Sequence, residues 1–251
     1  MELTILGAHG TWPGAGGATS GLLVRHEGFS VWIDAGSGTL ANLQRHIDLY
    51  DVGAVVISHS HPDHVSDIYA YFYSRLFGPE PQPKIPLFVA PKVVERVNPL
   101  LTDDSAEMRL AEAFDIEVVE PGAEHHVGPF RMATAPMRHS VPTIGVRLEA
   151  DGAAMAYSAD TGPTSEVEAL ASGADVFVAE ASWQGERGDQ PPIHLTATEA
   201  GEAGARAGAG RLTLTHIRPY MDVDLSKEEA AMAFDGDLVI ARDNDTMEVG
   251  T

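Results

Sequence analysis

Ser58-His59-Ser60-His61-Pro62-Asp63-His64 is the most informative stretch of the sequence, and it directly follows the apolar run Ala54–Ile57. It contains three imidazoles and one carboxylate, side chains that bury poorly without partners. In extended backbone, residues two apart point the same way, so His59 and His61 can bind one metal ion together. Imidazole and carboxylate ligands suit zinc or another borderline divalent ion.

The second half of this segment predicts the start of a helix. Pro62 suits the first helical position, where its missing N–H costs nothing. Asp63 and His64 then lie at the turn into the helix, where they can face a second metal ion. The alternative is a polar strand-to-helix loop that is rich in histidine, and the residues farther along the chain disfavour it.

Composition and charge limit the function classes. The 251 residues are 44% hydrophobic and 21% charged, which is typical of a globular protein. No segment is long enough to divide the chain, so we expect one domain over residues 1–251. The net charge of −21 disfavours a broad nucleic-acid surface, although a small anionic substrate stays compatible with a metal site.

The N-terminal residues and the apolar segments predict a compartment. Met1-Glu2-Leu3-Thr4-Ile5 begins a strand at once, without a basic or signal-type segment. No apolar run approaches the ~20 residues that span a bilayer. We therefore expect a cytoplasmic protein with no membrane partner. The absence of cysteine excludes disulfides and thiolate zinc ligands.

Strand and helix patterns alternate along most of the chain. We expect strands at Glu2–Leu6, Gly21–His26, Ser30–Asp34, Ala54–Ser58, Leu87–Val89, Glu117–Val119, Phe130–Ala135, Thr143–Glu149, Ala154–Ser158, Asp175–Ala179, Arg211–Thr215 and Leu238–Ile240. We expect helices at Leu40–Leu49, Pro62–Phe77, Val93–Leu101, Ser105–Phe114, Glu166–Ala171, Thr196–Ala207 and Ser226–Phe234. This order indicates an α/β fold with mixed sheets covered by helices.

Three more metal-binding side chains follow predicted strands. His139, Asp160 and His216 each lie just beyond a strand end, where sites in layered α/β folds are assembled. Each is a weak signal alone, because an isolated histidine after a strand is more often a surface or capping residue. With the segment at 59–64 they supply the seven ligands that a two-metal site needs.

These motifs, together with Asp34-Ala35-Gly36, resemble those of metallo-β-lactamase-fold hydrolases in order and over essentially the whole chain. The resemblance implies an α/β (α+β) four-layer αββα sandwich of two mixed sheets flanked by helices. The chain is most similar to the ribonuclease Z-like and bacterial cyclic-nucleotide phosphodiesterase-like branch. The residues that carry this narrower resemblance are Ser158-Ala159-Asp160-Thr161-Gly162, Glu180-Ala181-Ser182-Trp183, His194-Leu195-Thr196 and Leu214-Thr215-His216-Ile217-Arg218-Pro219.

The resemblance also implies a role for each site residue. His59, His61 and His139 would hold one zinc ion, and Asp63, His64 and His216 the other. Asp160 would bridge both ions, with manganese or iron as substitutes for zinc. Asp34 would orient the metal ligands from behind, although an aspartate in a simple turn is an equally good interpretation of Asp34 by itself.

Glu180 and His194 are the predicted leaving-group pair, with Asp63 as a further catalytic residue that orients the nucleophile. A carboxylate beside an imidazole keeps it protonated near neutrality, as a general acid requires. His194 also fits a purely structural position before Thr196, whose side chain forms a capping box with Glu199. By contrast, we interpret His125 and His126 as solvated loop residues.

The substrate prediction depends on one short interval. Ribonuclease Z proper binds tRNA with a long arm inserted between the positions of His139 and Asp160, which here are only 21 residues apart. We therefore expect a small phosphodiester such as a cyclic nucleotide, with tRNA 3′-end processing as the less favoured alternative. Hydrolysis of a thioester or lactone and a non-catalytic metal-binding role stay open. A homodimer is also left open, because the aromatic residues Tyr69–Phe77 suit an interface or a core.

Overall fold

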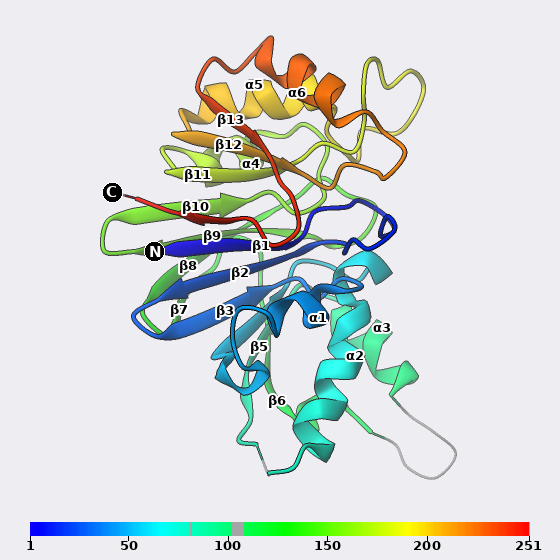
Figure 1. Cartoon of the computed structure of the whole chain (residues 1–251), viewed down its shortest axis with the longest axis vertical. Coiled ribbons are helices and arrows are strands. Elements are labelled where there is room, and N and C mark those ends of the chain that lie inside the picture. Colours follow the sequence, from blue (N-terminus) through cyan, green and yellow to red (C-terminus); the bar gives the residue numbers. More distant parts are fainter. Residues whose placement is uncertain (81, 102–107, 251) are drawn as a thin grey trace.

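The computed structural model describes residues 1–80, 82–101 and 108–250. Its central feature is a pair of seven-stranded sheets packed face to face. Figure 1 shows α1, α2 and α3 on one side of this pair and α4, α5 and α6 on the other. The order of layers is therefore helix, sheet, sheet, helix, which confirms the predicted sandwich.

The first sheet comes mainly from the N-terminal half of the chain. Its strands lie in the order β14 (Thr246–Glu248), β1 (Glu2–Gly7), β2 (Gly21–His26), β3 (Phe29–Ile33), β4 (Ala54–Ile57), β5 (Ile85–Val89) and β6 (Phe114–Val118). The pairs from β14 to β3 are antiparallel, whereas those from β3 to β6 are parallel.

The second sheet repeats this arrangement with the C-terminal half. Its strands lie in the order β13 (Asp237–Ile240), β12 (Arg211–Thr215), β11 (Val176–Glu180), β10 (Ala153–Tyr157), β9 (Ile144–Ala150), β8 (Phe130–Pro136) and β7 (Glu124–Val127). The pairs from β7 to β10 are antiparallel, and those from β10 to β13 are parallel.

Six α-helices cover the outer faces within the described residues. They are α1 (Thr39–Leu43), α2 (Pro62–Phe77), α3 (Val93–Val97), α4 (Ser165–Ala171), α5 (Ala197–Ala207) and α6 (Val223–Ala231). Pro62 occupies the start of α2, as predicted. None of the helices that the described residues form is long and apolar enough to cross a membrane.

Apolar burial holds the layers together. One core cluster joins the two sheets and includes Trp32 from β3 and Phe130 from β8, both fully buried. A second cluster packs Phe177 of β11 against the alanine-rich face of α5. The interior strand β11 is buried at every position, as expected for a parallel strand covered on both faces.

The structure corrects several predicted elements. The helix predicted at Leu40–Leu49 ends at Leu43 and is followed by a turn and a short 3₁₀ helix at Leu49–Asp51. The helix predicted at Ser105–Phe114 is wrong over its described part, where a 3₁₀ turn at Leu110–Glu112 leads into β6. The prediction for residues 105–107 lies outside the described residues.

Two edge strands were not predicted. His125 and His126 lie in β7, not in a loop, and His125 Nδ1 lies 2.9 Å from Glu117 Oε1. The other unpredicted strand is β14, which extends the first sheet beside β1. In both cases backbone pairing with a neighbour outweighs weak intrinsic strand propensity.

The aromatic residues of α2 divide between core and surface. Tyr71 and Phe72 are fully buried, as the core interpretation predicts. Tyr73 and Phe77 are exposed, and their rings stack on each other with centroids 5.6 Å apart.

Candidate metal centre

The candidate site lies where strands of both sheets end. The segment 58–64 links β4 to α2, so His59 and His61 follow one strand and Asp63 and His64 begin the helix. His139, Asp160 and His216 follow β8, β10 and β12 of the second sheet. The carboxyl ends of parallel strands lie at one edge of a sheet, which explains how residues far apart in sequence meet.

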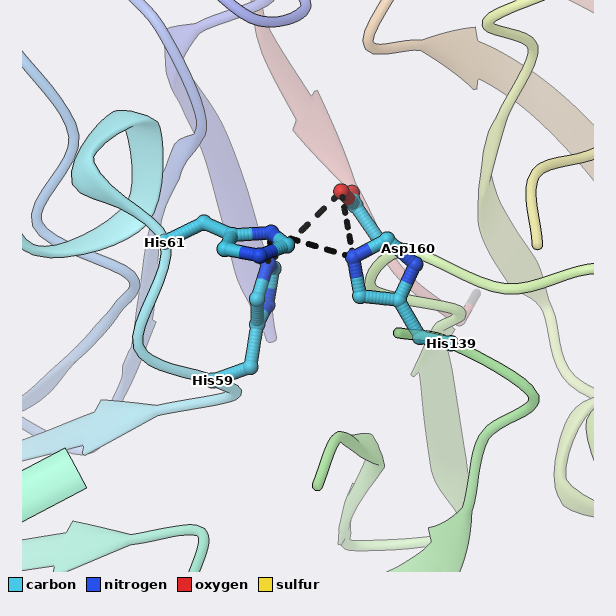
Figure 2. A group of neighbouring side chains, drawn as sticks. All are labelled: His59, His61, His139 and Asp160. Atoms are coloured by element: carbon cyan, nitrogen blue, oxygen red, sulfur yellow. Dashed lines mark hydrogen bonds and ion pairs between the residues drawn. The ribbon is translucent and has the colours of Figure 1, made fainter. Parts of the chain in front are cut away.

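Four of these residues form a first group of donor atoms (Figure 2). His61 Nδ1 lies 3.2 Å from His59 Nε2 and 3.1 Å from His139 Nε2. Asp160 Oδ2 lies 3.6 Å from the Nε2 atoms of both His59 and His139. Figure 2 shows the three rings and the carboxylate pointing toward one common centre.

The second group consists of Asp63, His64 and His216, with Asp160 beside it. His216 Nε2 lies 3.2 Å from Asp63 Oδ2 and 3.4 Å from Asp160 Oδ1. His64 Nε2 lies 3.2 Å from Asp160 Oδ1 and 3.8 Å from Asp63 Oδ2. Asp160 therefore presents one carboxylate oxygen to each group.

These separations fit the ligands of a metal ion. Nitrogen and oxygen donors about 2.0–2.2 Å from a tetrahedral zinc lie about 3.3–3.6 Å from one another. Asp160 Oδ1 is also a buried atom with no hydrogen-bond partner among the described residues, and an unpartnered buried carboxylate oxygen is costly. A cation would satisfy both observations, so the residues present fit one divalent ion in each group.

Contacts behind the histidines fix which nitrogen faces the centre. His64 Nδ1 lies 2.7 Å from Asp34 Oδ2, and His139 Nδ1 lies 2.9 Å from the Ile193 carbonyl. Both partners accept hydrogen bonds, so each ring donates its Nδ1–H outward and leaves the Nε2 lone pair facing inward. This arrangement is typical of metal-binding histidines.

His59 and His216, which also direct Nε2 toward the centre, each have a hydroxyl partner at Nδ1. His59 Nδ1 lies 3.0 Å from Ser58 Oγ, and His216 Nδ1 lies 2.7 Å from Ser182 Oγ. Ser58 Oγ in turn donates to Asp34, and Ser182 Oγ donates to Glu180 at 2.6 Å. Each hydroxyl proton is thus committed to a carboxylate, which leaves the hydroxyl oxygen to accept from the imidazole.

Asp34 is fully buried and is the main support behind the site. Its Oδ1 accepts the Ser58 backbone N–H at 2.7 Å. Its Oδ2 accepts from His64, from Ser58 Oγ at 2.7 Å and from the Tyr157 hydroxyl at 3.1 Å. Its backbone has φ 58°, a left-handed conformation that aspartate tolerates better than most residues.

Burial and charge set the protonation of the first group. Burial lowers the pKa values of His59, His61 and His139, and neighbouring imidazoles lower those of His59 and His61 further. Burial opposes ionisation of Asp160, but the facing imidazoles of His216 and His64 outweigh it and hold its pKa well below its ordinary value. The first group is thus biased toward neutral imidazoles and an ionised carboxylate, the forms that bind metals.

The second group is more strongly charged. Burial also opposes ionisation of Asp63, yet its hydrogen bond with His216 and the nearby imidazoles lower its pKa to about 2. Burial opposes protonation of His64, but the carboxylates of Asp160 and Asp34 outweigh it and raise its pKa well above the ordinary value. The carboxylates thus create a strong preference for a positive charge between Asp34 and Asp160.

The buried Glu180 and the partly buried His194 form a pair at the edge of the site. His194 Nδ1 lies 2.9 Å from Glu180 Oε1, which also accepts the Thr161 N–H at 2.7 Å. Burial opposes protonation of His194, but the charge of Glu180 and this hydrogen bond raise its pKa to about 9. His194 is therefore protonated at neutral pH.

Local structure also fixes the position of His194. The predicted capping box is present, since Glu199 N donates to Thr196 Oγ1 at 3.1 Å and Thr196 N donates to Glu199 at 2.8 Å. Arg187 donates to the His194 carbonyl at 2.9 Å. The structural and the catalytic interpretations of His194 are thus compatible.

Asp160, His194 and His216 form a further group of possible ligands, but His194 Nδ1 is 3.9 Å from Asp160 and already paired with Glu180.

The structure thus brings together all the residues singled out in the sequence: Asp34, His59, His61, Asp63, His64, His139, Asp160, Glu180, His194 and His216. The sequence assigned no part to Ser58, Tyr157 and Ser182, which hold the ligands from behind. Ser58 and Ser182 lie inside the quoted motifs, so their positions could have identified them as partners of the ligands. Tyr157 carries no local signal, because its contact with Asp34 spans 123 positions.

A glycine-rich loop and two arginine side chains border the site. The Thr11 N–H donates to Asp63 Oδ2 at 2.9 Å, which ties the loop after β1 to the metal centre. A side chain at Gly10 would clash with His216, because an added Cβ would lie 2.3 Å from the His216 carbonyl oxygen. Arg96 donates to Ser60 Oγ at 2.7 Å, and the exposed Arg138 precedes His139.

Comparisons with known proteins agree with this geometry. A family model described as a beta-lactamase superfamily domain matches residues 30–217. The uncharacterized protein Rv1339 of Mycobacterium tuberculosis is 34% identical over 99% of this chain and 92% of its own length. Ribonuclease Z of Mycobacterium bovis (strain BCG / Pasteur) is 28% identical over 99% and 98%. The crystal structure of YhfI from Bacillus subtilis, a metallo-beta-lactamase fold protein, superposes with a TM-score of 0.86 at 26% identity and covers 99% of each chain.

Proposed function

The chain belongs to the beta-lactamase superfamily and is a metallo-hydrolase of the metallo-β-lactamase fold, and from this premise we propose that it is a dinuclear zinc phosphodiesterase acting on a small phosphodiester such as a cyclic nucleotide. His59, His61 and His139 would hold one ion, and Asp63, His64 and His216 the other. Asp160 would touch both ions. When bound, the two cations supply Lewis-acid chemistry: they acidify water and neutralise phosphate charge.

One observation carries this proposal. Seven side chains from both sheets present donor atoms in two groups that share Asp160, with neighbouring donors 3.1–3.8 Å apart. Packing alone does not explain such a cluster, because histidines and carboxylates are rarely buried together without a partner. The fixed outward hydrogen bonds of His64 and His139 support the same interpretation.

The protein's own groups would divide the remaining work. Asp63 and Asp160 carry negative charge toward the centre, which holds the cations and orients the attacking water. His194 is protonated at neutral pH and is held by Glu180 through Nδ1, so it would donate its Nε2 proton to the departing alkoxide. Such proton transfer contributes typically ~10²–10⁴-fold to a rate. The start of α2 at Pro62 adds the positive end of a helix beside the anion.

The chain between His139 and Asp160 supports a small substrate. This interval is filled by the tight hairpin of β9 and β10, with their register running from Ala150–Ala153 to Val146–Tyr157. Every residue of the interval is described, and no long insertion leaves the sheet within it to grip a large RNA. Arg96 and Arg138 place positive charge near the site in a chain whose net charge is −21, which favours a compact anion.

The experiment is a side-by-side assay of bis-p-nitrophenyl phosphate, cyclic AMP and a precursor tRNA with zinc or manganese added. We expect hydrolysis of the two small diesters, and loss of it in His139→Ala. His126→Ala is the matched control, because His126 is an exposed histidine in β7. Cleavage of the tRNA alone would favour the activity of the ribonuclease Z relative and contradict the small-substrate proposal. No turnover of any substrate by metal-replete protein would contradict an enzymatic role.

A further inference from the structure

Two large aromatic side chains are exposed beside the metal centre. Trp12 is 46% exposed and Tyr220 is 65% exposed, yet their rings stack with centroids 5.8 Å apart and planes inclined by 21°. Both lie on segments that touch the ligands. Trp12 follows Thr11, whose N–H donates to Asp63, and Tyr220 is four positions after His216.

Arg218 connects this stacked pair to a second tryptophan. The Arg218 guanidinium carbon lies 4.2 Å from the centroid of the Trp183 ring, and Arg218 Nη1 donates to the Tyr220 hydroxyl at 3.3 Å. Trp183 itself follows Ser182, which contacts His216 Nδ1. Trp12, Trp183, Arg218 and Tyr220 thus form one continuous group, which we call the aromatic rim.

The aromatic rim is close to the reacting side of the site. Arg218 is two positions after the candidate ligand His216, and the His216 ring stacks on the ring of His194, the proposed proton donor, with centroids 5.8 Å apart. Arg218 is half-buried and carries a fixed positive charge in a strongly acidic protein. A negatively charged group that reaches the metal ligands would therefore meet a cation at the aromatic rim.

The chemistry of the aromatic rim selects one kind of substrate. Exposed tryptophan and tyrosine rings offer flat faces on which a nucleobase stacks, and such stacking contributes ~1–3 kcal/mol per base. Arginine adds charge and a planar group that recognises phosphate. A sugar phosphate or an aliphatic diester has no aromatic face to stack on these rings. The combination of aromatic faces and a guanidinium next to a phosphodiester site is therefore suited to a nucleotide.

We propose that the aromatic rim binds the base of a nucleotide whose phosphate lies at the metal ligands, so that the substrate class is a nucleoside-bearing phosphodiester. This proposal rests on the proposed function, and it adds residues that set specificity. Trp12 provides the main stacking face. Tyr220 and Arg218 hold Trp12 and the phosphate-facing charge in place.

The test compares two ligands that differ only in the base. Adenosine 5′-monophosphate and ribose 5-phosphate are titrated by calorimetry into the zinc-loaded protein. We expect Trp12→Ala to weaken the binding of adenosine 5′-monophosphate by ~5–150-fold, the range that corresponds to ~1–3 kcal/mol. Binding of ribose 5-phosphate should change by less than ~2-fold. Trp12→Phe keeps an aromatic face and should retain most of the affinity for the nucleotide.

Tyr73→Ala is the matched control. Tyr73 also belongs to an exposed stacked pair, with Phe77, but it lies ten residues along α2 from Asp63, about 15 Å away. We expect this variant to bind both ligands as the parent protein does. A loss in Tyr73→Ala equal to that in Trp12→Ala would mean that the effect is not local to the aromatic rim, and would overturn the proposal.

The remaining outcomes separate this proposal from the proposed function. Suppose that bis-p-nitrophenyl phosphate is hydrolysed but the two ligands bind equally well, or that Trp12→Ala weakens the binding of both equally. The aromatic rim then does not recognise the base, and the phosphodiesterase assignment stands. If the base strengthens binding through Trp12 but no phosphodiester is hydrolysed, the aromatic rim is a nucleotide site and the proposed function is wrong.

Discussion

Asp34→Asn isolates the support behind the second group of ligands. Asparagine is nearly the same size and tolerates the left-handed backbone at φ 58°, so the change removes charge without a cavity or new strain. The amide side chain keeps only one oxygen. If that oxygen accepts the Ser58 N–H, an NH₂ group faces His64 Nδ1, the Ser58 hydroxyl and the Tyr157 hydroxyl, all of which donate to Asp34 in the parent protein.

The expected magnitude follows from these contacts. A hydrogen bond to a charged group contributes about 1.5–3 kcal/mol, and here the one to His64 is lost while its Nδ1–H is left buried. His64 then tends to carry its proton on Nε2, which removes a metal ligand. We therefore expect the ion at Asp63, His64 and His216 to bind ~10–100-fold more weakly, the usual cost of removing such a support. The effect on the first group should be smaller, because Asp34 reaches His59 only through Ser58.

The assay is competition between the protein and a chromophoric chelator, with metal content per chain measured in parallel. Asp175→Asn is the control, since Asp175 also accepts a backbone N–H, from Ala154 at 2.8 Å, but it precedes β11 at the opposite end from the site. Circular dichroism checks that both variants are folded. Zinc affinity in Asp34→Asn within ~3-fold of the parent would refute the reasoning.

Two further predictions test the proton donor and the backbone strain. His194→Gln should keep both metal ions but lower kcat for cyclic AMP by ~10²-fold or more. With bis-p-nitrophenyl phosphate, whose leaving group needs no proton, kcat should fall by less than ~10-fold. Equal losses of kcat on the two substrates in steady-state assays would argue against proton donation. Ala159, next to Asp160, has the left-handed φ of 50°. In Ala159→Gly, the relief of ~1–2 kcal/mol of backbone strain should offset the loss of the buried methyl group. The free energy of unfolding should therefore stay within ~1 kcal/mol of that of the parent protein. The control Ala156→Gly, in β10 of the same sheet, should destabilise the protein by ~1–2 kcal/mol. If urea denaturation gave the same loss of unfolding free energy for Ala159→Gly and Ala156→Gly, backbone strain at Ala159 would be contradicted.

Much of the fold was predictable because local and tertiary preferences agree. The helix at Pro62–Phe77 has a proline at its start and an apolar face, and the strand Arg211–Thr215 is flanked by glycine and a site residue. The edge strand β7 was missed because Glu-His-His-Val has little intrinsic strand propensity and is stabilised by pairing with β8. At Leu40–Leu49 the helical pattern continues beyond Leu43, yet the backbone turns away after one helical turn.

The site was predictable in two different degrees. Spacing alone predicted that His59 and His61 lie together, and their facing nitrogens are 3.2 Å apart. The approach of His139, Asp160 and His216 was indicated by their positions after predicted strands and was made specific by the family resemblance, because nothing local encodes a contact between residues as far apart in the chain as His61 and His139. Tyr157 and Ser182 stayed unidentified because their roles exist only once both sheets are folded.

Anomalous diffraction at the zinc absorption edge, on crystals of the zinc-replete protein, is the most direct test of the proposed two-metal centre. Two peaks are expected in each chain, one among His59, His61 and His139 and the other among Asp63, His64 and His216, with Asp160 in contact with both. A single peak, or peaks located away from these seven side chains, would contradict a dinuclear centre at this site.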